Sequence, residues 1–204
     1  MLIGNSGAGK TYLMLQMIRN REKLFDKPIN KIVYCYSVFQ PIFNDFPEVT
    51  FHEGLIKNVE EIFPASDGDM HHILVLDDQI MQLNDPEDGK IISKLFLIYS
   101  HHLHVNVYLL SQNLFFQNKH MRNISLNTHY IFLFRMKRDV TQVKRFLTQL
   151  APGKTQLLMD TYNKITNKPY SYACFDLSPG IEESFIIRSE ILPGEIENIS
   201  IPKS

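Results

Sequence analysis

The chain has 204 residues, of which 44% are hydrophobic and 21% charged, with 9 glycines and 10 prolines. This composition excludes collagen-like, low-complexity and disordered polyelectrolyte chains, and the length favours one domain with a single core. Lys and Arg number 21 against 22 Asp and Glu, a net charge of −1, so charge alone predicts no general affinity for nucleic acid or anionic membranes.

The sequence carries no signal for membrane insertion or secretion. No apolar run approaches the ~18–20 residues of a membrane span, and Met1–Ser6 has no basic region leading into an apolar one. Cys35 and Cys174 lie in apolar, strand-like runs and form no C-x-x-C pair. Free buried thiols in a reducing compartment fit better than disulfides or a zinc site. We therefore expect an intracellular, non-secreted protein without contact to a membrane.

Strands and helices alternate along the chain. Met1–Ile3 has the composition of a strand end, and apolar residues recur at helical spacing from Leu13 to Leu24. Further patterns predict strands at 31–37, 73–76, 106–111, 129–134 and 170–177, and helices at 89–103 and 139–150. Most of 38–72 is expected to be loop and short helix, and 85–89 a solvated loop. This alternation predicts an α/β fold with a mainly parallel sheet flanked by helices and a site at the carboxyl ends of its strands.

We expect the core to span residues 1–177. Pro179-Gly180, Pro193-Gly194 and Pro202 predict an extended C-terminal segment over 178–204. The first strand has three residues before Gly4, whereas strands usually have about five. We therefore hypothesise that this strand is truncated, and either that Met1 is not the natural start or that the chain is a gene fragment.

The strongest chemical motif follows this first strand. Eight residues match the Walker A pattern G-x-x-x-x-G-K-[ST], namely Gly4, Asn5, Ser6, Gly7, Ala8, Gly9, Lys10 and Thr11. In such a P-loop the backbone N–H groups surround the phosphates, Lys10 reaches the β- and γ-phosphate oxygens and the Thr11 hydroxyl ligates Mg²⁺. The motif predicts binding of ATP with Mg²⁺; a glycine turn without nucleotide is the alternative.

A second motif, typical of Walker B, ends the apolar run Ile73–Leu76 with Asp77 and Asp78. In a parallel sheet this strand end lies where the P-loop phosphates bind. We assign Asp77 to Mg²⁺, opposite Thr11, and Asp78 to the water that attacks the γ-phosphate. Many hydrolysing P-loop enzymes have Glu at the second position, so Asp78 requires the water to sit closer or the strand to shift. The alternative is a plain strand end followed by an acidic turn.

Gln112 and Arg122 are further catalytic candidates. Gln112 follows the apolar strand Val107–Ser111, where it acts either as a sensor bonded to the γ-phosphate and the water or as a plain polar strand end. A guanidinium from a neighbouring subunit can neutralise charge in the phosphoryl-transfer transition state. Arg122 is the first choice for that role, with Arg135 and Arg138 as rivals and a simple surface cation as the other interpretation.

Basic residues are concentrated between residues 119 and 154, a segment that we call the basic stretch. Its eight cations accompany the single acid Asp139, and they are Lys119, Arg122, Arg135, Lys137, Arg138, Lys144, Arg145 and Lys154. Charge patterning alone fits either a solvated helix or a phosphate-binding face.

The order of these motifs resembles the FtsK/HerA superfamily, and within it the DNA-packaging ATPases of tailless double-stranded DNA viruses and Polinton-like elements. The resemblance covers roughly residues 2–177. It depends most on Ser111-Gln112-Asn113 and on the run from Arg122 through Asn127 to Phe134. It implies an ASCE-type, RecA-like P-loop NTPase that assembles as a ring and uses ATP hydrolysis to drive duplex DNA into a capsid.

The same resemblance implies ATP and Mg²⁺ as cofactors, and double-stranded DNA, further copies of the chain and capsid components as partners. It also implies a place in the host cell, in a virus factory or the nucleus, or association with the virion. Two other functions remain open, a small-molecule (nucleotide) kinase of the P-loop class and a nucleotide-binding structural subunit without turnover. Asp78 counts against the kinase, because kinases of this class do not need a catalytic carboxylate beside Asp77.

Overall fold

The computed structural model describes residues 1–64, 70–115, 117–182, 186–195 and 198–200. The chain forms two compact units. The P-loop unit consists of Met1–Ile18, Gln112–Phe116 and His129–Ser204, and the Asp-Asp unit of Arg19–Ser111 and Gln117–Thr128. Among the described residues, no helix has both the length and the apolar character needed to cross a membrane.

Four parallel strands form the centre of the Asp-Asp unit. They lie in the order β3 (Thr50–Glu53), β2 (Ile29–Tyr36), β4 (His71–Asp77) and β5 (Val105–Ser111). The middle of β4 is fully buried, with no exposed surface on Ile73, Leu74, Val75 or Leu76. A continuous apolar run of this kind fits a strand covered on both faces, as parallel sheets require.

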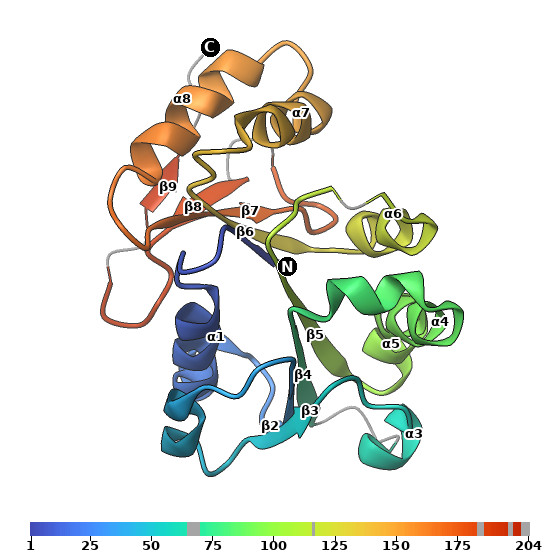
Figure 1. Cartoon of the computed structure of the whole chain (residues 1–204). Helices are drawn as coiled ribbons and strands as arrows, with labels where there is room; N and C mark the ends of the chain where they lie inside the picture. The colour runs from blue at the N-terminus through green and yellow to red at the C-terminus, as the bar shows by residue number, and fades with distance from the viewer. Residues whose placement is uncertain (65–69, 116, 183–185, 196–197, 201–204) are drawn as a thin grey trace. The chain divides into compact units, whose positions relative to one another are not determined.

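The helices of the Asp-Asp unit are short. They are α2 (Arg21–Leu24), η1 (Pro41–Asp45), α3 (Val59–Ile62), η2 (Gln79–Asn84), α4 (Pro86–Lys94), the π-helical η3 (Leu95–Tyr99), α5 (Ser100–His102) and α6 (Lys119–Leu126). Helix α4 packs against α6, and α5 packs against β5 (Figure 1). Ile92, Leu95 and Ile124 are fully buried in this layer, so apolar burial holds the helices in place.

In the P-loop unit, β1 (Leu2–Ile3) pairs in parallel with β6 (Tyr130–Phe134), and Ile3 lies opposite Leu133. The antiparallel strands β7 (Tyr172–Asp176), β8 (Ile187–Ser189) and β9 (Asn198–Ser200) continue from β6. Helix α1 (Lys10–Arg19) follows the loop after β1. Helices α7 (Val140–Leu150) and α8 (Thr155–Ile165) pack against each other, and α8 also contacts β7 (Figure 1).

The predicted α/β class is confirmed, since mainly parallel strands alternate with helices. The predicted strands and the helices of α1, α4 and α7 are present, whereas β3, α6 and α8 are elements that the sequence patterns did not predict. The segment 178–204 contains β8 and β9, while its residues 183–185, 196–197 and 201–204, Pro202 among them, lie outside the described residues. The domain boundary after residue 177 stays a prediction.

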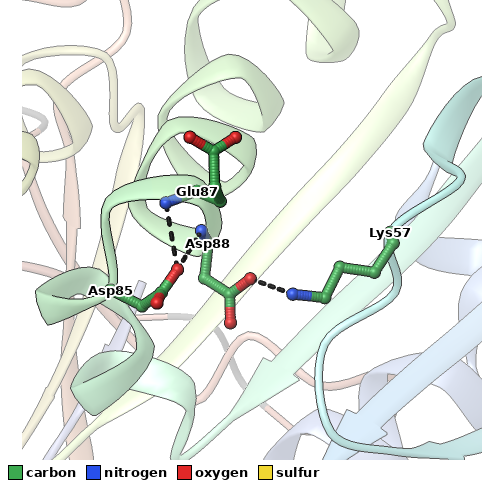
Figure 2. Close-up of polar contacts among 4 residues, drawn as sticks. All are labelled: Lys57, Asp85, Glu87 and Asp88. Carbon is green, nitrogen blue, oxygen red and sulfur yellow. Dashed lines mark hydrogen bonds and ion pairs between the residues drawn. The ribbon is translucent and has the colours of Figure 1, made fainter.

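The expectation of a solvated loop at 85–89 is wrong, because these residues begin helix α4. Asp85 is the N-cap, and its carboxylate accepts hydrogen bonds from the backbone N–H groups of Glu87 at 3.0 Å and Asp88 at 2.9 Å (Figure 2). The bond from Asp88 holds the pKa of Asp85 below its usual value. Lys57 forms an ion pair with Asp88 in the same cluster (Figure 2).

We predict that Asp85→Ala lowers the thermal midpoint of unfolding at neutral pH, because both N–H groups lose their acceptor. Asp85→Asn should lose little, since Asn is also a good N-cap. The folded-state pKa of Asp85 is depressed, so its contribution to stability is complete above about pH 4 and is lost as the pH falls through the folded-state pKa. Circular dichroism melts between pH 7 and pH 3 measure this contribution. The thermal midpoint of Asp85→Asn should fall less than that of the wild type as the pH is lowered, because Asn does not titrate. Equal midpoints for wild type and Asp85→Ala at pH 7 would contradict the prediction.

In the P-loop unit, the space around Gly4, directly after β1, leaves no room for a side chain. A Cβ placed on Gly4 would lie 2.7 Å from Phe134 Cβ and 3.1 Å from Ala8 Cβ. At Gly7 a Cβ would meet nothing within 4 Å, but φ is +73°. Gly4 is therefore required for space, and Gly7 for its backbone conformation.

We predict that Gly4→Ala destabilises the chain by about 1–3 kcal/mol, because β1 and β6 must separate to admit the methyl group. Gly7→Ala carries only the left-handed backbone cost of about 1–2 kcal/mol. Gly7→Asn should recover part of that cost, since Asn tolerates positive φ, whereas Gly4→Asn should be no better than Gly4→Ala. Urea unfolding of the four variants measures the differences, and recovery at Gly4 with asparagine would refute the steric explanation.

Candidate functional site

The loop between β1 and α1 adopts a tight turn with its lysine held inside. Gly7 and Gly9 have φ values of +73° and +102°, and the N–H of Ala8 donates to Asn5 O at 3.1 Å. The ammonium group of Lys10 donates to the carbonyl oxygens of Gly4 at 2.7 Å and Asn5 at 3.2 Å. Because Lys10 is 8% exposed, its charge is fixed beside the loop instead of extending into solvent.

The first turn of α1 begins within this loop. Lys10 is the first helical residue and Thr11 the second, and the N–H of Leu13 donates to Gly9 O at 2.9 Å. A helix N-terminus directly after a glycine loop presents backbone N–H groups and a positive dipole end to an anion. The segment predicted as a P-loop thus forms a glycine turn that leads directly into a helix N-terminus.

The two predicted carboxylates differ in burial although they are consecutive. Asp77 ends β4, is 7% exposed and accepts a hydrogen bond from the Tyr34 hydroxyl of β2 at 2.6 Å. Asp78 is exposed and has a φ of +55°, a left-handed conformation that Asp tolerates better than most residues. The change in backbone direction after Asp77 therefore separates a buried carboxylate from an exposed one.

Backbone contacts hold Asp78 in this conformation. Its N–H donates to Leu110 O at 3.3 Å, and its carbonyl oxygen accepts from the Ser37 hydroxyl at 3.3 Å. Gln79 is fully buried and donates to Ser37 Oγ at 3.0 Å and to Asp77 O at 3.3 Å. Non-glycine residues with positive φ are costly and persist where neighbours fix them, as they do here.

Gln112 lies directly after β5, belongs to the P-loop unit and is exposed. The segment behind it is tied to α7, because Gln142 Oε1 accepts hydrogen bonds from the N–H groups of Leu114 and Phe115, both at 3.1 Å. Arg145 of α7 lies over the Phe115 ring, 5.2 Å from its centroid. The segment that follows Gln112 is thus attached to α7, a helix of the basic stretch.

All eight cations of the basic stretch are exposed, Arg122 among them on α6. Lys119 and Arg122 belong to the Asp-Asp unit, and the other six belong to the P-loop unit. Arg135, a rival of Arg122 for the catalytic role, donates to Thr166 O at 3.3 Å. Exposure leaves these charges accessible to a phosphate backbone or to a neighbouring subunit.

The predicted site residues are therefore divided between the two units. The P-loop and Gln112 lie in the P-loop unit, whereas Asp77, Asp78 and Arg122 lie in the Asp-Asp unit. The predicted donor set for Mg²⁺ combines the half-buried Thr11 hydroxyl with the buried Asp77 carboxylate. Such hard oxygen donors suit Mg²⁺, which usually keeps several waters and binds one or two carboxylates together with substrate phosphates.

Sequence patterns do not indicate three residues that support the candidate site, namely Tyr34, Gln79 and Gln142. Tyr34 belongs to a β-branched and aromatic run that predicts only a strand, yet its hydroxyl donates a hydrogen bond to Asp77. Gln79 follows the two aspartates directly, and its burial is not visible in its residue type. For Gln142 the only signal was its position three residues after Asp139, the N-cap of α7, whose carboxylate accepts from Gln142 N at 3.4 Å.

Comparison of the sequence with protein-family models and with curated proteins gives no match. Solved structures do match. The genome packaging NTPase B204 from Sulfolobus turreted icosahedral virus 2, in complex with ATP-gammaS, is 13% identical with a TM-score of 0.54, covering 100% of this chain and 96% of that chain. The DNA-packaging ATPase B204 from Sulfolobus turreted icosahedral virus is 12% identical with a TM-score of 0.53, covering 100% and 96%.

A third similar structure is the cytoplasmic domain of the Type VII secretion ATPase EccC from Thermomonospora curvata. It is 15% identical with a TM-score of 0.59, covering 92% of this chain and 24% of that chain. At such low sequence identities, structural similarity establishes the fold alone. The resemblance to viral DNA-packaging ATPases predicted from the sequence is therefore confirmed for the fold. The chain has the α/β fold of P-loop ATPases.

Proposed function

We propose that the chain is the subunit of a homo-oligomeric ring that hydrolyses Mg-ATP and packages double-stranded viral DNA into capsids. The observation that carries this proposal is the P-loop, with Lys10 buried beside the carbonyl groups of Gly4 and Asn5. The fold shared with two viral packaging ATPases over almost their whole length supports the choice of substrate. Such a motor acts where capsids are filled, inside the infected cell, with capsid components as further partners.

Within this proposal the P-loop N–H groups and Lys10 bind the triphosphate. Thr11 and Asp77 would hold Mg²⁺, which when bound would supply positive charge to neutralise the phosphates. Asp78, exposed directly after β4, orients or deprotonates the attacking water. Gln112 senses the γ-phosphate, and Arg122 stabilises the transition state on the ATP of a neighbouring subunit.

The proposal assigns ground-state binding to Lys10 and turnover to Asp78. Lys10→Ala should weaken Mg-ATP binding by about 10- to 100-fold, the value of a charge-assisted hydrogen bond. Asp78→Asn should bind Mg-ATP normally and lose about 10²- to 10⁴-fold in hydrolysis rate. Equilibrium binding and phosphate-release assays on both variants test this division, and equal loss of nucleotide affinity in both would refute it.

The decisive experiment measures ATPase rate with and without duplex DNA, alongside phosphate transfer to nucleoside monophosphates. A ring motor hydrolyses ATP faster with DNA of any sequence and transfers no phosphate to monophosphates. Transfer to a monophosphate would establish a kinase instead. Binding without turnover in either assay, with Lys10→Ala as the control that weakens binding, would establish a structural subunit.

We also predict that the basic stretch supplies the DNA-facing surface. Lysine and arginine that meet phosphates release counterions, so affinity falls steeply with salt and carries little base information. Joint replacement of the exposed Lys137, Lys144 and Arg145 by glutamine should lower DNA stimulation and the salt slope of DNA binding, while basal ATPase remains. The control replaces three exposed lysines outside the stretch, Lys23, Lys27 and Lys164, and removes the same charge. Unchanged stimulation and salt slope in the first variant would exclude this surface as the DNA site.

A further inference from the structure

Tyr170 occupies the turn between α8 and β7 of the P-loop unit. The turn is closed by a hydrogen bond from Ser171 N to Lys168 O at 3.4 Å, with Pro169 and Tyr170 at its two central positions. Tyr170 has a φ of +64°. A β-turn with proline second and positive φ third is of type II, which favours glycine or asparagine at the third position. The turn itself therefore does not require tyrosine.

Packing does not require this tyrosine either, because 71% of its surface is exposed. The exposed ring nevertheless borders the P-loop. A Cβ placed on Gly9 would lie 3.3 Å from Tyr170 Cδ1 and 3.6 Å from Tyr170 Cβ. A large aromatic side chain in a costly backbone conformation, open to solvent beside a phosphate-binding loop, indicates a role in ligand binding.

We propose that Tyr170 is the surface on which the base of the bound nucleotide stacks, an inference that rests on the proposed function. The loop and Lys10 hold the phosphates, and a nucleotide places its base one sugar away from them. An aromatic ring beside Gly9 lies on the border of that loop and offers a π-face to the base. Stacking of this kind distinguishes a nucleotide from a bare triphosphate and tolerates different bases.

The first test compares binding of Mg-ATP with binding of Mg-tripolyphosphate, which has no base. Tyr170→Asn removes the ring and suits positive φ, so it should fold at least as well as the wild type. We expect it to lose about tenfold in Mg-ATP affinity and nothing in tripolyphosphate affinity. Tyr170→Phe should bind both like the wild type. The control is Tyr130→Asn, because Tyr130 is 45% exposed and lies at the end of β6 opposite to Phe134, which contacts Gly4.

A second test uses the lack of tryptophan in the chain. Tyr170→Trp introduces a single tryptophan at the proposed stacking surface. Stacking of a base should quench its fluorescence when Mg-ATP is added, and Mg-tripolyphosphate should not. Tyr130→Trp should respond to neither ligand.

The outcomes separate this inference from the proposed function. If the wild type binds neither ligand, the proposed function fails and the inference fails with it. If the wild type binds Mg-ATP and Tyr170→Asn binds it equally well, only the stacking inference is overturned. Loss of both ligands in Tyr170→Asn would also overturn it, because Tyr170 would then support the loop and not the base.

Discussion

The close approach of the P-loop to strand β6 is the constraint on which the candidate nucleotide site depends. Strand β1 has two residues, and its pairing with β6 brings Gly4 against Phe134, where there is no room for a side chain. The same turn positions the two carbonyl groups that accept hydrogen bonds from the Lys10 ammonium group, and helix α1 begins at Lys10. A phosphate site made of backbone N–H groups has this requirement because its geometry comes from the loop and not from flexible side chains. Neighbouring β6 is therefore part of the site although it contributes no polar group.

Local patterns predicted those parts of the structure whose physical cause is local. The P-loop combines three glycines, lysine and threonine within eight residues, so its sequence specifies both chemistry and turn. Strand β4 was predictable because burial on both faces demands a continuous apolar run. The start of α4 was also predictable, because Asp85-Pro86 followed by acidic residues is a strong signal for a helix N-terminus. The prediction of a loop at this position was nevertheless wrong. The error came from interpreting a cluster of charges as a solvated loop.

Other features depend on contacts that no local pattern reveals. Strand β3 has a largely exposed, polar sequence and is a strand because it pairs with β2. Helix α6 buries Met121 and Ile124 within a segment whose charge dominated its interpretation. The bond from Tyr34 to Asp77 joins residues 43 positions apart, and Tyr170, from the turn between α8 and β7, lies beside Gly9 of the P-loop. Residue types at these positions are unremarkable, so their importance appears only once tertiary contacts are known.

Contacts within the P-loop unit also bear on how a motor of this kind would work. On the proposed function, Gln112 reports on the γ-phosphate and α7 carries cations that meet DNA. The two are joined through Gln142, whose side chain accepts from Leu114 and Phe115, and through Arg145 over Phe115. If α7 moved without Leu114 and Phe115, two hydrogen bonds would break, and each typically contributes about 0.5–1.5 kcal/mol to stability. Because coupling between two sites is reciprocal, any influence of nucleotide on α7 through these contacts would, on the proposed function, be matched by an equal influence of DNA on the segment after Gln112.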